Sequence, residues 1–373
     1  MANKKNIPAV SVIIPMYNME KYIDECLDSV LGQTFEDYEV IVVDDCSTDN
    51  SAAIVESYIP KFRVSGVDRL RLVKSPANSG GRPGVPRNVG MRLSHGEYLM
   101  FVDSDDAITK SALKELYKVA KDFDAEVVHC EKFLSTQDET LSGHKGFQVM
   151  AMKKTDFVTK PTLFTENLAE RVKIFSSDKF DWSSYTNFVR RDFVMQNDLE
   201  FPDYKVCEDS VFSLYLLCLA KNFVLTPTVH YVYRDRQDSA TKPNQLSAEE
   251  RFHRWGEFFF RGITLLDKFL DRFAFFRENI AYKYAIYDLL MKTNSGPLLD
   301  VYSKIPSGQL DKLISWELSK VEDKTPLTTF FFSRMNIFNL NVVRLQGSLR
   351  QEHSKVKQLE EQIQQLQIQQ LQK

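Results

Sequence analysis

Short apolar runs alternate along the first third of the chain with stretches in which apolar residues recur at helical spacing. The runs lie at residues 10–14, 38–43, 70–73, 98–102 and 127–128, and each is typical of a buried strand. Helical spacing appears between them, at residues 19–31, 51–57, 87–94 and 110–121. This alternation predicts an α/β fold with an open, largely parallel sheet flanked by helices.

One run, Tyr98–Val102, leads directly into three carboxylates, Asp103, Asp105 and Asp106. Acidic groups so close together repel one another, and a bound Mg²⁺ or Mn²⁺ relieves the repulsion because these ions prefer carboxylate and phosphate oxygens. The alternative is an acidic turn in which Asp105 or Asp106 caps the next helix. Spacing alone does not decide between the two.

Polar residues also follow the first two predicted strands, at Pro15–Asn18 and Asp44–Asp45. Because ligands of parallel sheets bind outside the carboxyl ends of the strands, these residues should lie along the same edge as the carboxylate cluster. Tyr17 can stack on a flat base, although a lone tyrosine more often packs in a core. Asp45 can accept a hydrogen bond from a base or a ribose hydroxyl.

A glycine-rich loop that includes Asn78 and Gly80, followed by the pair Arg87–Asn88, can approach the same edge. Together these groups fit a nucleotide diphosphate, with the base at one end and metal-bridged phosphates at the other. Each signal is weak alone, and their convergence predicts the site.

A second acidic pair, Glu208–Asp209, precedes an apolar helix at residues 211–220. Two carboxylates at a helix start also serve as caps that compensate the helix dipole. Further along, Arg234 or Arg236 can neutralise a diphosphate, or form a surface salt bridge, and the sequence does not choose between the two arginines.

The last third of the chain changes character. Residues 247–340 show helical spacing without a convincing strand, which predicts a helical subdomain, and Phe330–Phe332 suggests either core packing or a membrane-surface anchor. Residues 341–373 carry apolar side chains at heptad positions, which predicts a coiled coil and a homodimer, although ten glutamines between Gln346 and Gln372 also fit a disordered tail.

Composition limits the kinds of protein that this chain can be. The net charge of −3 gives no support to nucleic-acid binding. Five scattered cysteines indicate reduced thiols, and no run approaches the length of a membrane helix. We therefore expect a cytoplasmic protein without a transmembrane segment, in at most peripheral contact with the inner face of a membrane.

Four ordered segments resemble the family 2 inverting glycosyltransferases of the GT-A fold: VSVIIPMYNMEKYIDECLDSVLGQTFEDYEVIVVDDCSTDNS, NSGGRPGVPRNVG, GEYLMFVDSDD and CEDSVFSLYLL. The resemblance implies a catalytic domain over residues 1–240, with a nucleotide-sugar half at 8–130 and an acceptor half at 131–240. It also implies a nucleotide-sugar donor, usually a UDP-sugar, a divalent cation, and inversion at the anomeric carbon.

Carried over by motif, the resemblance assigns roles to individual residues. Asp105, with Asp103 beside it, would hold the metal, and Asp209 would be the general base with Glu208 as its orienting neighbour. Trp182 and Tyr185 would lie on the acceptor side. The implied donor-binding set is Pro15, Tyr17, Asn18, Asp45, Asn78, Gly80, Arg87, Asp103, Ser104, Arg234 and Arg236.

The chain departs from the family pattern at Pro86, where alanine is commoner. The combination of Asn-Ser-Gly with Pro-Arg-Asn resembles the wall-teichoic-acid glycosyltransferases, which implies a cell-surface glycopolymer acceptor. Two rival functions stay open: a sugar-nucleotide nucleotidyltransferase, whose glycine-rich phosphate loop is missing after the first strand, and a catalytically dead nucleotide-sugar-binding scaffold, which would have lost the carboxylates that this chain keeps.

Overall fold

The computed structural model describes residues 7–136, 151–152, 157–177, 180–236 and 246–290, together with residues 309, 312, 313, 315, 316, 319 and 355. The chain divides into two units, Met1–Gln245 with Leu266–Leu290, and Leu246–Leu265 with Met291–Lys373, and each is described by itself. Phe330–Phe332 and nearly all of the predicted coiled coil lie outside the described residues, so the anchor and the dimer stay predictions.

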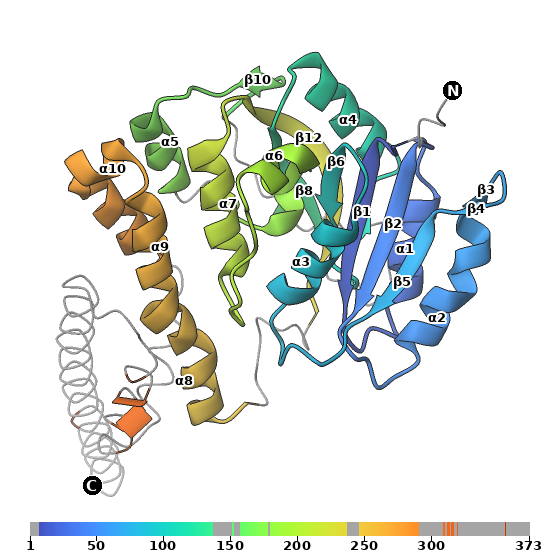
Figure 1. The fold of residues 1–373 in the computed structure, drawn as a ribbon, viewed down its shortest axis with the longest axis horizontal. Helices are drawn as coiled ribbons and strands as arrows, with labels where there is room; N and C mark the ends of the chain where they lie inside the picture. The colour runs from blue at the N-terminus through green and yellow to red at the C-terminus, as the bar shows by residue number, and fades with distance from the viewer. Residues whose placement is uncertain are drawn as a thin grey trace, which may run out of the picture. The chain divides into compact units, whose positions relative to one another are not determined.

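A ten-stranded sheet forms the centre of the first unit, in the order β10-β12-β8-β11-β6-β1-β2-β5, with β7 beside β12 and β9 beside β8 (Figure 1). Its strands are β1 (Val10–Met16), β2 (Tyr38–Asp44), β5 (Leu70–Lys74), β6 (Tyr98–Phe101), β7 (Ala107–Ile108), β8 (Val127–Thr136), β9 (Ala151–Met152), β10 (Thr162–Leu163), β11 (Asn187–Arg190) and β12 (Phe223–Arg234). A separate hairpin joins β3 (Arg63–Val64) to β4 (Val67–Asp68).

The predicted parallel sheet is present in the half formed by β6, β1, β2 and β5, where every neighbouring pair is parallel. The other half is mixed, because β11 lies antiparallel between β6 and β8. The sequence did not predict β11 as a strand, since its four residues follow a polar and aromatic segment without a clear turn signal.

Helices cover both faces of the parallel half. The helices of the first unit up to β12 are α1 (Ile23–Leu31), α2 (Ser51–Tyr58), α3 (Gly84–Leu93), α4 (Ala112–Asp122), α5 (Leu168–Phe175), α6 (Arg191–Gln196) and α7 (Glu208–Leu219), with short turns of 3₁₀ helix at Ile59–Phe62 and Ser184–Thr186. Alternate strand residues such as Val12 and Val40 join the core beneath α1, α2 and α4. On the opposite face α3 approaches closely, since a Cβ on Gly90 would lie 2.4 Å from Cγ2 of Ile13.

The alternative that Asp105 or Asp106 caps the following helix is wrong. Strand β7 begins directly after Asp106, and α4 begins only at Ala112, with Ser111 in the capping position. Asp106 is instead buried and accepts hydrogen bonds from Tyr231 Oη and the Arg234 backbone N–H. Contacts with β12, more than a hundred residues away, overrode the local preference for a cap.

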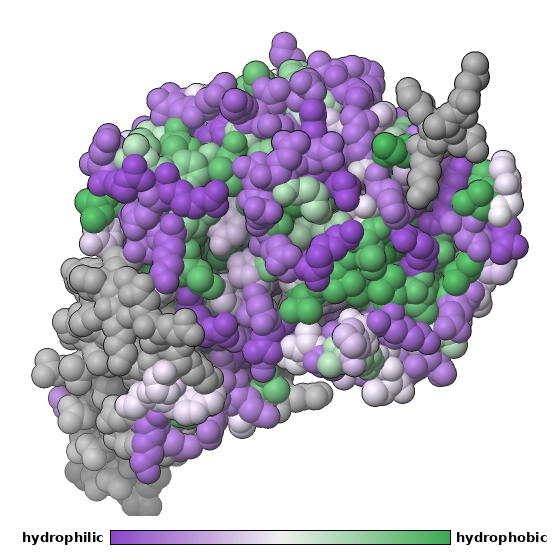
Figure 2. All heavy atoms as spheres, viewed as in Figure 1, coloured by the Kyte–Doolittle hydropathy of each residue, from purple (hydrophilic) through white to green (hydrophobic). Residues whose placement is uncertain are grey.

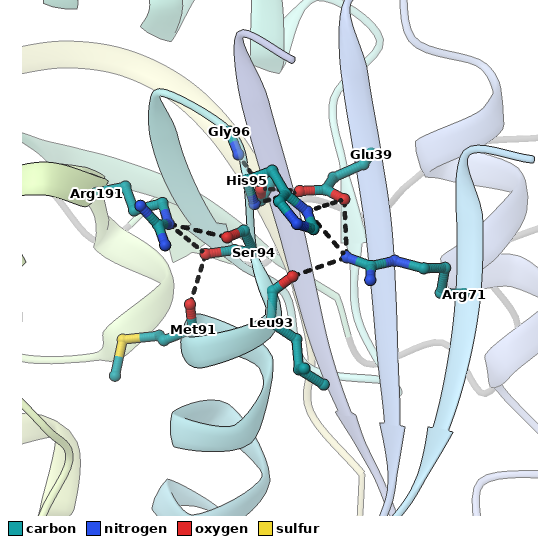
Figure 3. Close-up of polar contacts among 9 residues, drawn as sticks. Glu39, Arg71, Met91, Leu93, Ser94, His95, Gly96 and Arg191 are labelled. Carbon is teal, nitrogen blue, oxygen red and sulfur yellow. Dashed lines mark hydrogen bonds and ion pairs between the residues drawn. The ribbon is translucent and has the colours of Figure 1, made fainter. Parts of the chain in front are cut away.

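A polar cluster fixes the amino end of β6, the strand that leads to the carboxylates (Figure 3). Glu39 Oε1 accepts hydrogen bonds from the His95 backbone N–H at 2.6 Å and from Ser11 Oγ at 2.7 Å, while Arg71 Nη2 donates to Glu39 Oε2 at 2.9 Å. Ser11 Oγ also accepts from the Gly96 backbone N–H at 2.8 Å. The start of β6 is therefore tied to β1, β2 and β5 at the edge opposite the predicted site.

Helical structure continues after residue 246, as the spacing there predicts. The second unit contains α8 (Ala248–Glu257), a π-helical turn (Phe258–Gly262) and the start of α9 (Ile263–Leu270), and the first unit contains the rest of α9 and α10 (Ala274–Glu278). Ser247 and Glu250 form a reciprocal capping box at the start of α8.

The view in Figure 2 shows a mostly hydrophilic face with an apolar area over β2 and β5. Within the described part of the chain, no helix combines the length and the apolar character needed to cross a bilayer.

Candidate active site

The carboxyl ends of three parallel strands bring the predicted motifs to one edge of the sheet. Strand β1 pairs in parallel with both β2 and β6, so Met16, Asp44 and Phe101 end their strands on the same side. The Asp45 backbone N–H donates to the Met16 carbonyl at 2.8 Å, which joins the first two loops directly. The predicted grouping at one edge is confirmed, and the chemical role of each residue stays a prediction.

The expected base-binding end centres on Asp45, which is 4% exposed. Its carboxylate accepts from the Ser79 backbone N–H at 3.0 Å and from Ser79 Oγ at 2.7 Å. Asn78 Nδ2 donates to the Asp45 carbonyl at 2.6 Å, and Gly80 takes a left-handed conformation that places its N–H on Asn78 Oδ1. The glycine-rich loop is therefore docked on Asp45, while Tyr17, which follows the end of β1, is exposed.

Three non-glycine residues at the edges of the site have left-handed backbone: Asn18, Cys46 and Cys207, with φ of 52°, 64° and 67°. Such conformations cost free energy and persist only where the surroundings enforce them. For Asn18 the enforcing contacts are the Thr48 backbone N–H, which donates to Asn18 Oδ1 at 2.8 Å, and Ser47 Oγ, which accepts from the Asn18 N–H. Pro15 is buried within β1.

The carboxylate cluster is partly closed to solvent. The Asp103 side chain is 29% exposed and that of Asp105 is 18% exposed, while Asp106 is buried. Burial raises the pKa of Asp105; the Arg236 guanidinium opposes this rise and the charge of Asp103 adds to it. Burial, followed by the charges of Asp105 and Asp103, holds the pKa of Asp106 well above its usual range. The cluster thus favours either protons or additional positive charge.

Arg87 connects this cluster to the second acidic pair. The residue is 4% exposed, and its guanidinium donates from Nη2 to Asp103 Oδ1 at 2.7 Å and from Nη1 to Glu208 Oε1 at 2.8 Å. The guanidinium carbon lies 5.4 Å from the centre of the Phe201 ring. Burial alone would lower the pKa of Arg87, but Asp103, Glu208 and Asp209 together raise it, so the side chain is a permanent cation.

Asp209 occupies the first turn of α7, directly after Glu208. Burial and the charge of Glu208 raise its pKa to about 8, against a smaller lowering by Arg87. Its Oδ1 accepts from the Ser210 backbone N–H at 2.9 Å. Glu208 is buried against Arg87, so the two carboxylates have distinct surroundings: one is a fixed ion-pair partner and the other is a basic carboxylate.

The structure separates Arg234 from Arg236. Arg234 is 1% exposed, forms an ion pair with Glu25 and donates from Nε to the Asp105 carbonyl at 2.8 Å. Arg236 donates from Nε to the Asp105 carboxylate at 2.6 Å. Both guanidinium groups lie over the Tyr22 ring, at 4.9 Å and 5.2 Å from its centre.

Asp103 and Asp105 fit a divalent cation as an incomplete ligand set. Both offer carboxylate oxygens, and Mg²⁺ or Mn²⁺ is commonly held by one or two carboxylates plus substrate phosphates. Among the described residues, no three His, Cys, Asp or Glu side chains converge as a complete cage. Phosphate oxygens and water would supply the remaining ligands.

The two aromatic residues expected on the acceptor side are committed to packing. The Tyr185 ring is 8% exposed and stacks on Tyr231 with the ring centres 4.1 Å apart, while Trp182 Nε1 donates to the Phe175 carbonyl at 3.3 Å. Ser104 is buried. These geometries give no open aromatic face for a sugar at Tyr185, and the acceptor roles stay predictions.

Several residues at this edge were not singled out from the sequence. Ser79 holds Asp45, Glu25 holds Arg234, and Tyr231 Oη donates to Asp106 Oδ2 at 2.7 Å. The signal for Ser79 was its place between Asn78 and Gly80. Glu25 carried no signal, since its partner lies 209 residues away in the sequence.

Comparison with known proteins identifies the family of one domain. Residues 11–178 match the profile of glycosyl transferase family 2. These residues form a family 2 glycosyltransferase domain. It is 33% identical over 232 residues to a poly(ribitol-phosphate) β-glucosyltransferase of Bacillus spizizenii, with 61% of this chain and 32% of that protein covered. It is 31% identical over 246 residues to the poly(ribitol-phosphate) β-N-acetylglucosaminyltransferase TarS of Staphylococcus aureus, with 65% and 38% covered.

The fold agrees with this assignment. A crystal structure of S. aureus TarS residues 1–349 in complex with UDP-GlcNAc is similar with a TM-score of 0.58 and 25% identity, and covers 88% of each chain. The predicted GT-A architecture of the family 2 domain is confirmed by this likeness. The chain spans about a third of the length of the two curated relatives.

Proposed function

We propose that this chain is an inverting glycosyltransferase that moves a sugar from a nucleotide-sugar donor to a hydroxyl of a cell-surface glycopolymer. The observation that carries the proposal is the Arg87 bridge, which holds Asp103 of the strand-end cluster and Glu208 of α7 on one guanidinium. Asp103 and Glu208 thus share one guanidinium, which supports a single site that contains both a donor-side carboxylate and a base.

The donor would lie along the carboxyl edge of β1, β2 and β6. Tyr17 and Asp45 lie at the end suited to a base, and the Asp103–Asp105 segment lies at the end suited to the diphosphate. UDP is the nucleotide we infer, since the crystal structure of the similar TarS domain holds UDP-GlcNAc. Asp45 would have to share or release Ser79 in order to bond the base.

Asp209 would act as the general base. An inverting transfer is an in-line displacement, so the acceptor hydroxyl must lose its proton on the face opposite the departing diphosphate. The raised pKa of Asp209, about 8, makes it a better proton acceptor than an ordinary carboxylate. Glu208, fixed by Arg87, would orient this carboxylate and raise its basicity through its charge.

Asp103 and Asp105 are the residues that would hold a divalent cation, Mn²⁺ or Mg²⁺, and the bound ion would stabilise negative charge on the departing diphosphate. The acceptor that we infer is a polyol-phosphate polymer, because both curated relatives are named for poly(ribitol-phosphate). The metal assignment rests on the carboxylate oxygens of Asp103 and Asp105, and the acceptor assignment rests on the similarity to these relatives.

The test is transfer by the purified chain with UDP-glucose or UDP-N-acetylglucosamine, Mn²⁺ and poly(ribitol phosphate). We expect UDP release and a β-linked product by NMR. Asp209→Asn should lower kcat by about 10²- to 10⁴-fold while UDP binding by calorimetry stays within a few fold of wild type. Asp192→Asn, the same change at a side chain that is 76% exposed, is the matched control.

Two outcomes would contradict the proposal. Near-normal turnover by Asp209→Asn would remove Asp209 as the base. Tight UDP-sugar binding without turnover against any acceptor in a panel of polyol-phosphate polymers would favour the binding scaffold instead.

A further inference from the structure

Arg234 ends β12, Arg236 lies two residues later, and the two guanidinium groups contact different atoms of Asp105. Arg234 is embedded: its guanidinium pairs with Glu25 and bonds the Asp105 carbonyl, and its backbone N–H donates to Asp106 Oδ1 at 2.8 Å. All these contacts belong to the frame of the strand-end loop. Arg234 therefore cannot change partner without disrupting the loop.

Arg236 lies two residues beyond, past the last residue of β12. Its Nε lies 2.6 Å from Asp105 Oδ2, its Nη2 lies 3.8 Å from Met19 Sδ, and its guanidinium covers the Tyr22 ring. Its side chain is 13% exposed, so the pair with Asp105 is largely shielded from water. A side-chain cation therefore occupies the carboxylate that the proposed function assigns to the divalent metal.

We propose that Arg236 is an internal counter-ion that withholds Asp105 from the divalent cation until a diphosphate arrives. The inference rests on the proposed function, because it takes Asp105 as a metal ligand. A guanidinium and a divalent cation on the same carboxylate repel each other strongly in a shielded site. Metal binding at Asp105 is therefore disfavoured while Arg236 stays on Oδ2.

A diphosphate gives Arg236 a better partner. Arginine binds phosphate oxygens through two parallel charge-assisted hydrogen bonds, whereas its contact with Asp105 is made through Nε. The displaced guanidinium can move to the diphosphate while the metal takes its place on the carboxylate. Metal and nucleotide then bind with positive coupling, which by linkage is the same in both directions.

The experiment measures Mn²⁺ affinity of the full chain by electron paramagnetic resonance, without and with saturating UDP. Without UDP, Arg236→Gln should bind Mn²⁺ more tightly than wild type by at least about fivefold, the lower end of typical coupling factors. With UDP present, the variant should gain no such advantage, so the effect of UDP on Mn²⁺ affinity is smaller in the variant.

Two further variants separate charge from other effects. Arg236→Lys keeps a cation beside Asp105 and should bind Mn²⁺ within about twofold of wild type, well below a typical coupling factor. Lys74→Gln removes one positive charge at the end of β5, from a side chain that is 61% exposed and pairs with Glu56, and should also behave as wild type. Thermal unfolding checks that each variant is folded.

The outcomes separate the counter-ion role of Arg236 from the proposed glycosyltransferase function. If wild type binds UDP and Mn²⁺ together but Arg236→Gln binds Mn²⁺ alone no more tightly than wild type, the counter-ion role is overturned and the proposed function stands. A similar gain in Lys74→Gln also overturns it, since the effect would then be general electrostatics. If folded wild type binds neither UDP nor Mn²⁺, the proposed function fails and the inference fails with it.

Discussion

Replacing Arg87 by methionine removes the buried cation that bridges Asp103 and Glu208. Methionine keeps an unbranched chain of similar length, so the change is chiefly one of charge. Breaking a buried ion pair by removing one partner costs about 3 to 5 kcal/mol, because a charge is left without compensation. Glu208 is buried and carries most of this cost, whereas the Asp103 side chain is 29% exposed and can be partly hydrated. We expect Arg87→Met to lower the free energy of unfolding by an amount within that range.

The control lies on the same helix. Arg92 pairs with Glu200 at 2.6 Å, but both side chains are more than half exposed, so Arg92→Met should cost no more than about 1 kcal/mol. Equilibrium unfolding in urea, followed by circular dichroism at pH 8, gives both values. The double variant Arg87→Met/Glu208→Gln should recover part of the loss, since the stranded charge is gone.

The pH dependence gives a second readout. Arg87 lowers the pKa of Asp209 in the wild type, so without Arg87 the folded-state pKa of Asp209 rises further above its unfolded value. The folded variant then binds more protons than the unfolded chain, and its free energy of unfolding rises as the pH falls. The difference in free energy of unfolding between wild type and Arg87→Met should therefore be smaller at pH 5.5 than at pH 8. A loss below about 1 kcal/mol at pH 8, equal to that of Arg92→Met, would refute the bridge as a buried, mutually compensating network.

Two other predictions follow from the same geometry. Because Asp209 acts as a base only when deprotonated and its pKa is about 8, transfer should rise about tenfold per pH unit below that value and level off above it. Glu208→Gln removes the neighbouring charge and should shift the midpoint to lower pH, and an unchanged midpoint would contradict the coupling. Gly96→Ala should lower the free energy of unfolding by about 1 to 3 kcal/mol, since overpacking against backbone is not relieved by a rotamer change. The added Cβ would lie 2.4 Å from the Ser11 backbone nitrogen, and a wild-type urea midpoint would show that β1 and the turn before β6 can separate without cost.

The sequence by itself determined much of the fold between residues 10 and 122. The longer strands and helices between residues 10 and 122 follow from local periodicity, which depends on neighbouring residues, and their boundaries differ by only a few positions from those observed. The two-residue strands β3, β4 and β7 were not predicted. Because parallel strands end at one edge, the same pattern also predicted that the Tyr17, Asp45 and Asp103 segments would meet. The family motifs added roles that periodicity alone does not give.

Only the tertiary structure decided which partners the charged groups have and how deeply each is buried. Glu208 and Arg87 are 121 residues apart in sequence, so nothing local could reveal that one guanidinium holds both acidic segments. Arg234 and Arg236 are alike in sequence context, and only burial and the contacts of Glu25 and Asp105 distinguish the fixed cation from the one on the predicted metal ligand. Burial and long-range pairing depend on which strands become neighbours, and the insertion of β11 between β6 and β8 has no local signature.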